Sequence, residues 1–187
     1  MSPVELEQRI AEHVRDIPDY PKPGVVFKDI TPLLADAATF ATVVEALAAP
    51  FTTGAESGSE GTLAVPDVVV GIEARGFILA APVAHALGAG FVPIRKQGKL
   101  PARTLSATYD LEYGSETMEM HADAFAPGAR VLIVDDVLAT GGTAAAAMDL
   151  VAKAGGTVHG LSFLLELGFL SGREQVPTAR PHVLMTV

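Results

Sequence analysis

The chain has 187 residues, 49% of them hydrophobic, which is long enough to bury one sizeable core. A formal net charge of -9 argues against binding along a nucleic-acid backbone, and the absence of cysteine excludes disulfides, a thiolate nucleophile and thiolate metal ligands. The N-terminal stretch has no apolar run, and no later stretch reaches membrane-spanning length without a charge, Pro or Gly cluster. We therefore expect one cytoplasmic domain over residues 1–187, with no membrane and no nucleic-acid partner.

The N-terminal part of the chain predicts two helices separated by a proline-rich segment. A capping-box pattern over Ser2 to Glu5 begins an amphipathic helix whose apolar positions continue to Ile17. Prolines end it, and an irregular segment is expected over 19–32. A second helix is expected over 37–49, followed by a Gly- and Ser-rich surface loop over 52–62.

The remainder of the chain alternates strands with helices. Helices are expected over 77–87 and 144–154, and strands over 65–72, 91–94, 104–112, 116–121, 130–134, 157–165 and 183–187. The strands 104–112 and 116–121 are expected to pair antiparallel through a turn at Tyr113-Gly114. Apolar strands that alternate with helices predict a parallel sheet covered on both faces, with ligands beyond the carboxyl ends of the strands.

One stretch is basic and free of acids. Between Ala74 and Tyr109 there is no Asp or Glu, whereas the basic residues there are Arg75, Arg95, Lys96, Lys99 and Arg103. In an acidic protein such a stretch is typical of a local site for a small polyanion, although a solvated basic loop has the same pattern. The charge pattern alone leaves both interpretations open.

The segment VLIVDDVLATGGT, residues 131–143, carries the most chemical information. It predicts a strand, an acidic pair, a turn rich in glycine and hydroxyls, and the start of a helix. Gly141 and Gly142 allow positive φ and a close approach of the backbone to a ligand, while Thr140 and Thr143 add hydroxyls. Because the free amides at a helix N-terminus favour an anion, the turn predicts a phosphate site. It lacks the lysine of a nucleotide-triphosphate loop and the GxGxxG fingerprint.

The acidic pair, Asp135 and Asp136, sharpens this interpretation. Two carboxylates beside a phosphate repel it unless another group lies between them, and vicinal ribose hydroxyls suit that place. The pair can accept hydrogen bonds from the 2- and 3-hydroxyls and help to hold a divalent cation through the sugar and water. The alternative is an acidic pair that caps a nearby helix.

At these residues the sequence resembles a known family. Segment 131–143 is similar to the 5-phosphoribosyl 1-pyrophosphate (PRPP) motif of the type I phosphoribosyltransferases. The stretches that resemble the adenine phosphoribosyltransferases in particular are DYPKPGVVFKDIT (19–31), EARGF (73–77), RKQGKLP (95–101) and YDLEYG (109–114). The resemblance covers about residues 9–174 and weakens in the loop 52–62, which is longer than usual.

The resemblance implies an α/β protein with the type I phosphoribosyltransferase fold, a central and mostly parallel sheet flanked by helices. Residues 1–35 would form an N-terminal helix and a base-binding hood, and residues 65–187 the core with an antiparallel flexible-loop excursion. The implied activity is a pentosyl transfer of purine salvage, from PRPP to adenine, which gives AMP and pyrophosphate. It further implies Mg2+ held mainly by PRPP and water, and a homodimer.

The resemblance also assigns PRPP-binding residues. They are Asp135, Asp136, Ala139, Thr140, Gly141, Gly142, Thr143, Arg75, Arg95 and Lys99. The turn after the first sheet strand would wrap the pyrophosphate, with a non-proline cis peptide between Glu73 and Ala74. The three cations would offset the pyrophosphate charge, with one or two of them reaching across a dimer interface.

For the base, the resemblance implies a hood and a catalytic acid. Phe27 would stack on the purine, and main-chain groups near Val26 would read the adenine edge. Glu112 would handle the purine proton through N7, and Tyr113 would help to close the site. Lys28 is also assigned to adenine. At this position many members of the family have arginine and others have lysine, so the resemblance does not imply a bidentate contact by Lys28.

Two other functions fit parts of the same pattern. A phosphoribosyltransferase for hypoxanthine, guanine, xanthine or orotate would have the same phosphate turn, although the segments around Phe27 and Glu112 favour adenine. A non-catalytic regulator that senses PRPP would need a nucleic-acid module or a basic face, neither of which the sequence predicts.

Overall fold

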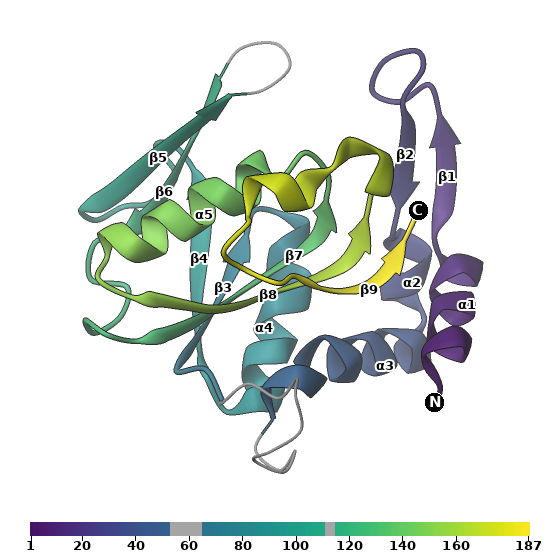
Figure 1. Ribbon diagram of the computed structural model, residues 1–187, viewed down its shortest axis with the longest axis horizontal. Coiled ribbons are helices and arrows are strands. Elements are labelled where there is room, and N and C mark those ends of the chain that lie inside the picture. Colours follow the sequence, from purple (N-terminus) through teal and green to yellow (C-terminus); the bar gives the residue numbers. More distant parts are fainter. Residues whose placement is uncertain (53–64, 111–114) are drawn as a thin grey trace.

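The computed structural model describes residues 1–52, 65–110 and 115–187, which include a sheet in the order β5-β6-β4-β3-β7-β8-β9 (Figure 1). The strands are β3 (Val68–Ile72), β4 (Gly90–Lys96), β5 (Thr104–Asp110), β6 (Ser115–His121), β7 (Arg130–Leu138), β8 (Thr157–Glu166) and β9 (His182–Thr186). Strands β4, β3, β7, β8 and β9 run parallel, whereas β6 pairs antiparallel with β4 and with β5. The predicted mostly parallel sheet is confirmed.

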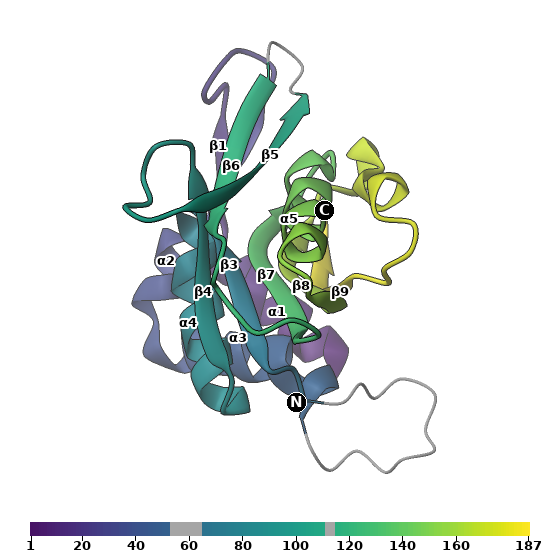
Figure 2. The same cartoon turned by 90° about the vertical axis from the view of Figure 1, so that its left-hand side faces the viewer.

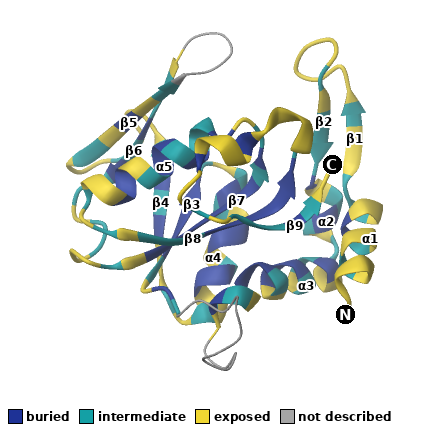
Figure 3. Ribbon diagram, in the orientation of Figure 1, coloured by how far each residue is buried: buried dark blue, intermediate teal, exposed yellow. Residues whose placement is uncertain are grey.

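Helices cover both faces of the parallel strands because successive apolar residues of each strand point to opposite sides. Val69 and Leu132 pack with α3 (Ala37–Ala48) and α4 (Arg75–Leu87), whereas Val70 and Ile133 pack with α5 (Gly142–Lys153). Figure 2 shows α4 and α5 on opposite sides of β3 and β7. The strands β7 and β8 are buried between these layers (Figure 3).

The first helix is shorter than its apolar pattern predicts. The helix α1 (Pro3–His13) begins with the predicted capping box, in which Ser2 Oγ accepts from Glu5 N at 3.3 Å and the Glu5 carboxylate accepts from Ser2 N at 2.7 Å. It ends at His13, so the prediction that it continues to Ile17 is wrong.

A hairpin replaces the rest of that helix and part of the predicted irregular segment 19–32. The strand β1 (Arg15–Pro18) pairs antiparallel with β2 (Val26–Asp29), which places Ile17 opposite Phe27. Lys28 Nζ lies 2.7 Å from Asp16, so a cross-strand ion pair also supports the pairing. These partners lie ten or more residues apart, which explains why helical spacing in the first segment was misleading.

Other differences concern element boundaries and short helices. The strand β7 extends to Leu138 and includes both aspartates, and α4 begins at Arg75. The short helices that were not predicted are α2 (Thr31–Ala35), η1 (Ala49–Phe51), η2 (Gly168–Leu170) and η3 (Gly172–Gln175). The turn predicted at Tyr113-Gly114 and residues 53–62 of the predicted loop lie outside the described residues. In the described ranges no helix is long and apolar enough to cross a membrane.

Candidate active site

The turn formed by residues 139–143, called the phosphate turn below, joins β7 to α5. Gly141 has a φ of 86°, and a Cβ at this position would lie 2.3 Å from Gly172 O, so the turn requires glycine there. The first-turn amides of α5 have no partner within the helix and favour an anion. A small cavity of about 50 Å³ is lined by Asp135, Ala139, Thr140, Gly141 and Thr143, among others.

The acidic pair lies directly before this turn. Asp135 and Asp136 are only 9% and 5% exposed, and Asp136 N donates to Asp135 Oδ1 at 2.9 Å. Arg75 Nε lies 2.8 Å from Asp136 Oδ2, but without hydrogen-bond geometry, so this buried oxygen accepts no hydrogen bond in the described structure. Burial and the neighbouring Asp136 charge raise the pKa of Asp135 well above its usual range. Burial also raises the pKa of Asp136, against the opposing effect of Arg75.

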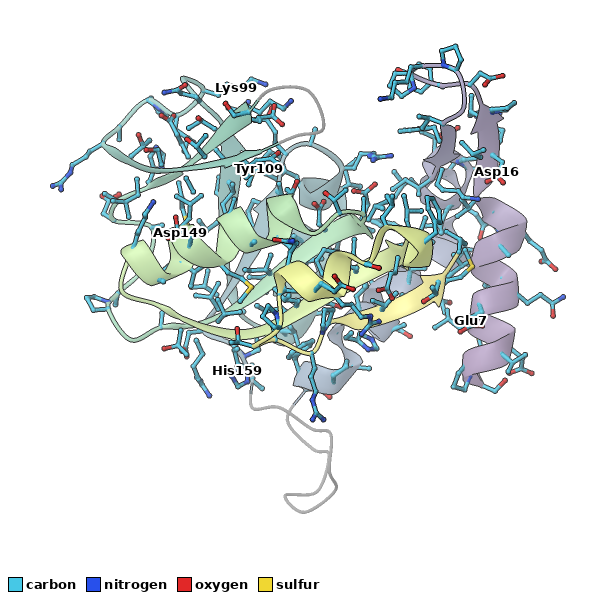
Figure 4. All side chains as sticks on the ribbon, turned by 45° about the horizontal axis from the view of Figure 1, so that its top comes forward. Glu7, Asp16, Lys99, Tyr109, Asp149 and His159 are labelled. Atoms are coloured by element: carbon cyan, nitrogen blue, oxygen red, sulfur yellow. The ribbon has the colours of Figure 1, made fainter. Side chains whose placement is uncertain are left out.

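A cavity of about 380 Å³ opens beside the acidic pair. The β1–β2 hairpin contributes Val26, Phe27 and Lys28, and the β5–β6 arm contributes Tyr109 from the other side. Figure 4 shows Asp16 on the hairpin and Tyr109 on the arm, at opposite sides of the molecule's upper edge. Ala139 and Thr143 also line the cavity, so it is continuous with the phosphate turn.

Arg75 connects the hairpin to the acidic pair. Its guanidinium carbon lies 4.9 Å from the centre of the Phe27 ring, and its Nη1 donates to Lys28 O at 3.4 Å. Tyr20 packs edge-on against Phe27 with ring centres 5.2 Å apart. The Phe27 ring thus contacts a cation on one face and a second ring in a T-shaped arrangement. The Lys28 ammonium is neutralised by Asp16 within the hairpin.

The other predicted cations lie beside the cavity rather than on its wall. Arg95 Nε lies 3.4 Å from Glu73 Oε2, and the Lys99 ammonium pairs with Glu73 Oε1. Glu73 itself lines the cavity, and its peptide bond to Ala74 is cis, as the family resemblance implies. Burial opposes ionisation of Glu73, but the Lys99 ammonium and the Lys96 amide outweigh it and hold the pKa of Glu73 below its usual value.

Several cavity residues were not predicted. Lys96 pairs with Glu116, whose Oε2 accepts from Tyr109 Oη at 2.9 Å, and Leu167 lies at the carboxyl end of β8. Hydrogen bonding to Lys96 lowers the pKa of Glu116, and burial raises the pKa of Tyr109. Lys96 was inside the basic stretch, and Leu167 lies two residues beyond the predicted strand 157–165, so both carried a usable signal. Glu116 had none, because its role depends on pairing between strands.

The predicted catalytic residue Glu112 and the predicted closing residue Tyr113 lie outside the described residues. Their neighbours Tyr109 and Glu116 line the cavity on the two strands of the arm. Of the remaining predicted residues, Gly142 lines a neighbouring hollow with Thr140.

Fold and site together define a phosphoribosyltransferase-type protein, and residues 61–166 match the family model of the phosphoribosyl transferase domain. The chain is 64% identical over 183 residues to the adenine phosphoribosyltransferase of Thermobifida fusca, covering 98% of each chain. The adenine phosphoribosyltransferase structure from Rhodothermus marinus matches with a TM-score of 0.87 at 48% identity, covering 98% of this chain and 99% of that one. The Saccharomyces cerevisiae enzyme, solved with an imino-altritol bisphosphate and adenine, matches with a TM-score of 0.86 at 36% identity, over 97% and 99% of the two chains. The chain belongs to the adenine phosphoribosyltransferase family.

Proposed function

We propose that this chain transfers the 5-phosphoribosyl group of PRPP to adenine and releases AMP and pyrophosphate, a reaction of purine salvage. The observation that carries the proposal is the single cavity that joins an aromatic hairpin, a buried acidic pair and the phosphate turn. An aromatic ring suits a purine, the acidic pair suits ribose hydroxyls, and the turn suits a phosphate. The name of each similar protein agrees with this assignment.

In this proposal the phosphate turn binds the 5-phosphate through the first amides of α5 and the hydroxyls of Thr140 and Thr143. The ribose hydroxyls donate to Asp135 and Asp136, whose Oδ2 atom lacks a hydrogen-bond donor. Arg75 lies between the base hairpin and the acidic pair, and we assign it to the pyrophosphate. Arg95 and Lys99, now paired with Glu73, supply further positive charge for the pyrophosphate.

The chemical step needs positioning more than a nucleophile. The bond from C1 of the ribose to the pyrophosphate oxygen breaks, the oxygen keeps the electron pair, and positive charge develops on the ribose. A purine nitrogen then forms the new bond to C1, and the proton lost from adenine passes to a general base. We assign that base to Glu112 and the closing role to Tyr113, from the sequence motif YDLEYG.

The donors of the site fit a magnesium ion that is held mainly by the substrate. Within the described ranges no group of three or more His, Asp or Glu side chains is arranged to hold a metal. Asp135 and Asp136 supply carboxylate oxygens, which Mg2+ prefers as ligands. Mg2+ usually combines one or two carboxylates with substrate phosphates and water. When bound with PRPP, the ion neutralises charge on the departing pyrophosphate.

Base selectivity tests the proposal directly. A backbone acceptor placed for the 6-amino group of adenine is left unpaired by the 6-oxo group of hypoxanthine, so we expect adenine to be strongly preferred. The assay incubates the protein with PRPP, Mg2+ and adenine, hypoxanthine, guanine, xanthine or orotate in turn and follows nucleotide formation. Faster turnover of another base would contradict the assignment of adenine as the substrate. Absence of turnover together with PRPP-dependent RNA binding would favour the alternative of a non-catalytic regulator that senses PRPP.

The Phe27 ring gives a second test, of the base site alone. Replacing Phe27 by Ala should raise the KM for adenine about tenfold, since stacking of a base on an aromatic ring contributes roughly 1–3 kcal/mol. The KM for PRPP should change much less. Tyr20→Ala is the matched control, because Tyr20 packs against the Phe27 ring but is 54% exposed and outside the cavity wall. Equal effects of both substitutions on adenine would place the base elsewhere.

We further propose that the protein acts in the cytoplasm as a homodimer. Ile78 on α4 and Phe91 on β4 are 44% and 38% exposed, so apolar surface is available next to the active-site elements. Sedimentation at micromolar concentration measures the oligomeric state, and a monomer at the concentration of full activity would contradict the dimer.

A further inference from the structure

A bidentate ion pair joins the end of β8 to the helix η3. Arg173 Nε donates to Glu166 Oε1 at 2.7 Å, and Arg173 Nη2 donates to Glu166 Oε2 at 2.7 Å. The Glu166 side chain is only 7% exposed, and this hydrogen bonding to Arg173 holds its pKa below the usual value. Neither residue belongs to the walls of the cavities beside the phosphate turn.

Glu166 is fixed close to the start of the phosphate turn. It lies in register with Leu138, the last residue of β7, and Leu167 N donates to Leu138 O at 2.9 Å. On its other side Glu166 pairs with Thr186 of β9, whose hydroxyl donates to Glu166 Oε2 at 3.3 Å. The Glu166 backbone is therefore held between β7 and β9, and its carboxylate is held by Thr186 as well as by Arg173.

The other end of the ion pair holds a segment that interlocks with the phosphate turn. A Cβ on Gly172 would lie 2.2 Å from Ala139 O, and a Cβ on Gly141 would lie 2.3 Å from Gly172 O and 2.8 Å from Gln175 Cβ. The two backbones are thus in direct contact without side chains between them. A displacement of η3 changes the position of the phosphate turn, because packed backbones of this kind have no free space.

From these contacts we infer that Arg173 and Glu166 are positioning residues, which hold the phosphate turn in the shape that binds the 5-phosphate. The inference rests on the proposed function, since it takes the phosphate turn to be the 5-phosphate site. Arg173 acts at a distance, through η3 and Gly172, and touches no substrate. Two parallel hydrogen bonds to a buried carboxylate fix both distance and orientation, which a single contact does not.

Substitution of Arg173 by Met tests the inference. It removes both hydrogen bonds to Glu166, and the one from Arg173 Nη1 to Pro181 O at 3.4 Å, while keeping much of the apolar stem. The buried carboxylate is left with one hydroxyl donor. We expect the dissociation constants of both PRPP and AMP, which share the 5-phosphate, to rise about tenfold, as for small misplacements of binding groups. The KM for adenine and the kcat at saturating PRPP should change less than twofold. Arg173→Lys, which keeps the charge but not the fork, should fall between Met and the wild type.

The Asp67–Arg130 pair provides a matched control. Arg130 Nε and Nη2 also form a fork, at 3.1 and 2.8 Å from Asp67, but this pair is exposed and lies at the amino ends of β3 and β7. Arg130→Met should leave PRPP and AMP binding unchanged. Thermal unfolding of both variants then separates an effect on stability from an effect on the turn.

The outcomes are distinct. If Arg173→Met unfolds at a lower temperature but binds PRPP and AMP within twofold of the wild type, the pair is only structural and the inference is overturned. A rise of the adenine KM equal to that of PRPP would also overturn it, because it would indicate general loosening. If Arg173→Met does not fold, unchanged PRPP and AMP binding by Arg173→Lys serves as the contradicting result. Failure of the wild-type protein to bind PRPP or AMP would instead contradict the proposed function.

Discussion

Replacing Asp135 and Asp136 together by Asn should weaken PRPP binding by about 100-fold or more. Each carboxylate is assigned to a ribose hydroxyl, and a hydrogen bond to a charged group contributes about 1.5–3 kcal/mol. Asn at position 135 keeps a side-chain oxygen that accepts from the backbone N–H of residue 136, but this oxygen carries no charge. Titration calorimetry with PRPP and Mg2+ measures the effect, and adenine binding serves as the internal control. Unchanged affinity would mean that the ribose lies elsewhere.

The same buried aspartates should lower the free energy of unfolding of the substrate-free protein. The pKa of Asp135 is raised in the folded chain by burial and by the Asp136 charge, so folding disfavours its ionised form. The contribution of Asp135 to wild-type stability therefore falls as the pH rises above the ordinary aspartate value of 3.8, and an uncharged residue avoids this loss. We expect Asp135→Asn to raise the free energy of unfolding at pH 7 by about 1 kcal/mol, a common gain when a binding site is neutralised.

Urea unfolding of the substrate-free protein at pH 7 and pH 4 checks the sign. The gain from Asp135→Asn should shrink at pH 4, which is close to the ordinary aspartate pKa of 3.8, because the carboxyl is then protonated in the folded chain and partly protonated in the unfolded chain. Asp136→Asn is the comparison. Arg75 lies 2.8 Å from Asp136, so removal of the Asp136 charge leaves the Arg75 guanidinium without its ion-pair partner. A destabilised Asp135→Asn protein at pH 7 would show that the charge of Asp135 is compensated in the fold.

Local sequence patterns were sufficient to predict the central strand of the sheet and the phosphate turn. The run 131–143 is apolar, then acidic, then rich in glycine, and each of these properties acts over a few residues, as does the helix signal in α5. The β1–β2 hairpin was missed because its partners, such as Ile17 and Phe27, are far apart in sequence while Leu6 to Ile17 keeps helical spacing. Periodicity reports local geometry, and pairing of distant strands overrides it.

The same distinction applies to the site. The aspartates, the turn and Phe27 belong to short motifs, and the structure places them around connected cavities. The contacts of Arg75 with Phe27 and Asp136 required three separate elements to meet, and the sequence carries no local sign of that. The pairing of Glu73 with Arg95 and Lys99 is of the same kind, and it explains why those cations lie beside the cavity and not on its wall.

Replacing Glu112 by Gln should lower kcat by about 100-fold or more, the usual contribution of a positioned general base. Gln keeps the size and a hydrogen-bonding oxygen but does not accept a proton, so PRPP affinity should be nearly unchanged. Single-turnover measurements with saturating PRPP separate the chemical step from product release. Unaltered turnover would remove Glu112 from proton transfer.

Glu116 is the decisive comparison, because it is the other candidate carboxylate of the arm and it lines the cavity. Its pKa is lowered by hydrogen bonding to Lys96, so at neutral pH it is held ionised as an ion-pair partner rather than poised to exchange a proton. Glu116→Gln should therefore reduce kcat far less than Glu112→Gln. If Glu116→Gln has the larger effect, the proton passes through the Lys96–Glu116–Tyr109 chain and the role assigned to Glu112 is wrong.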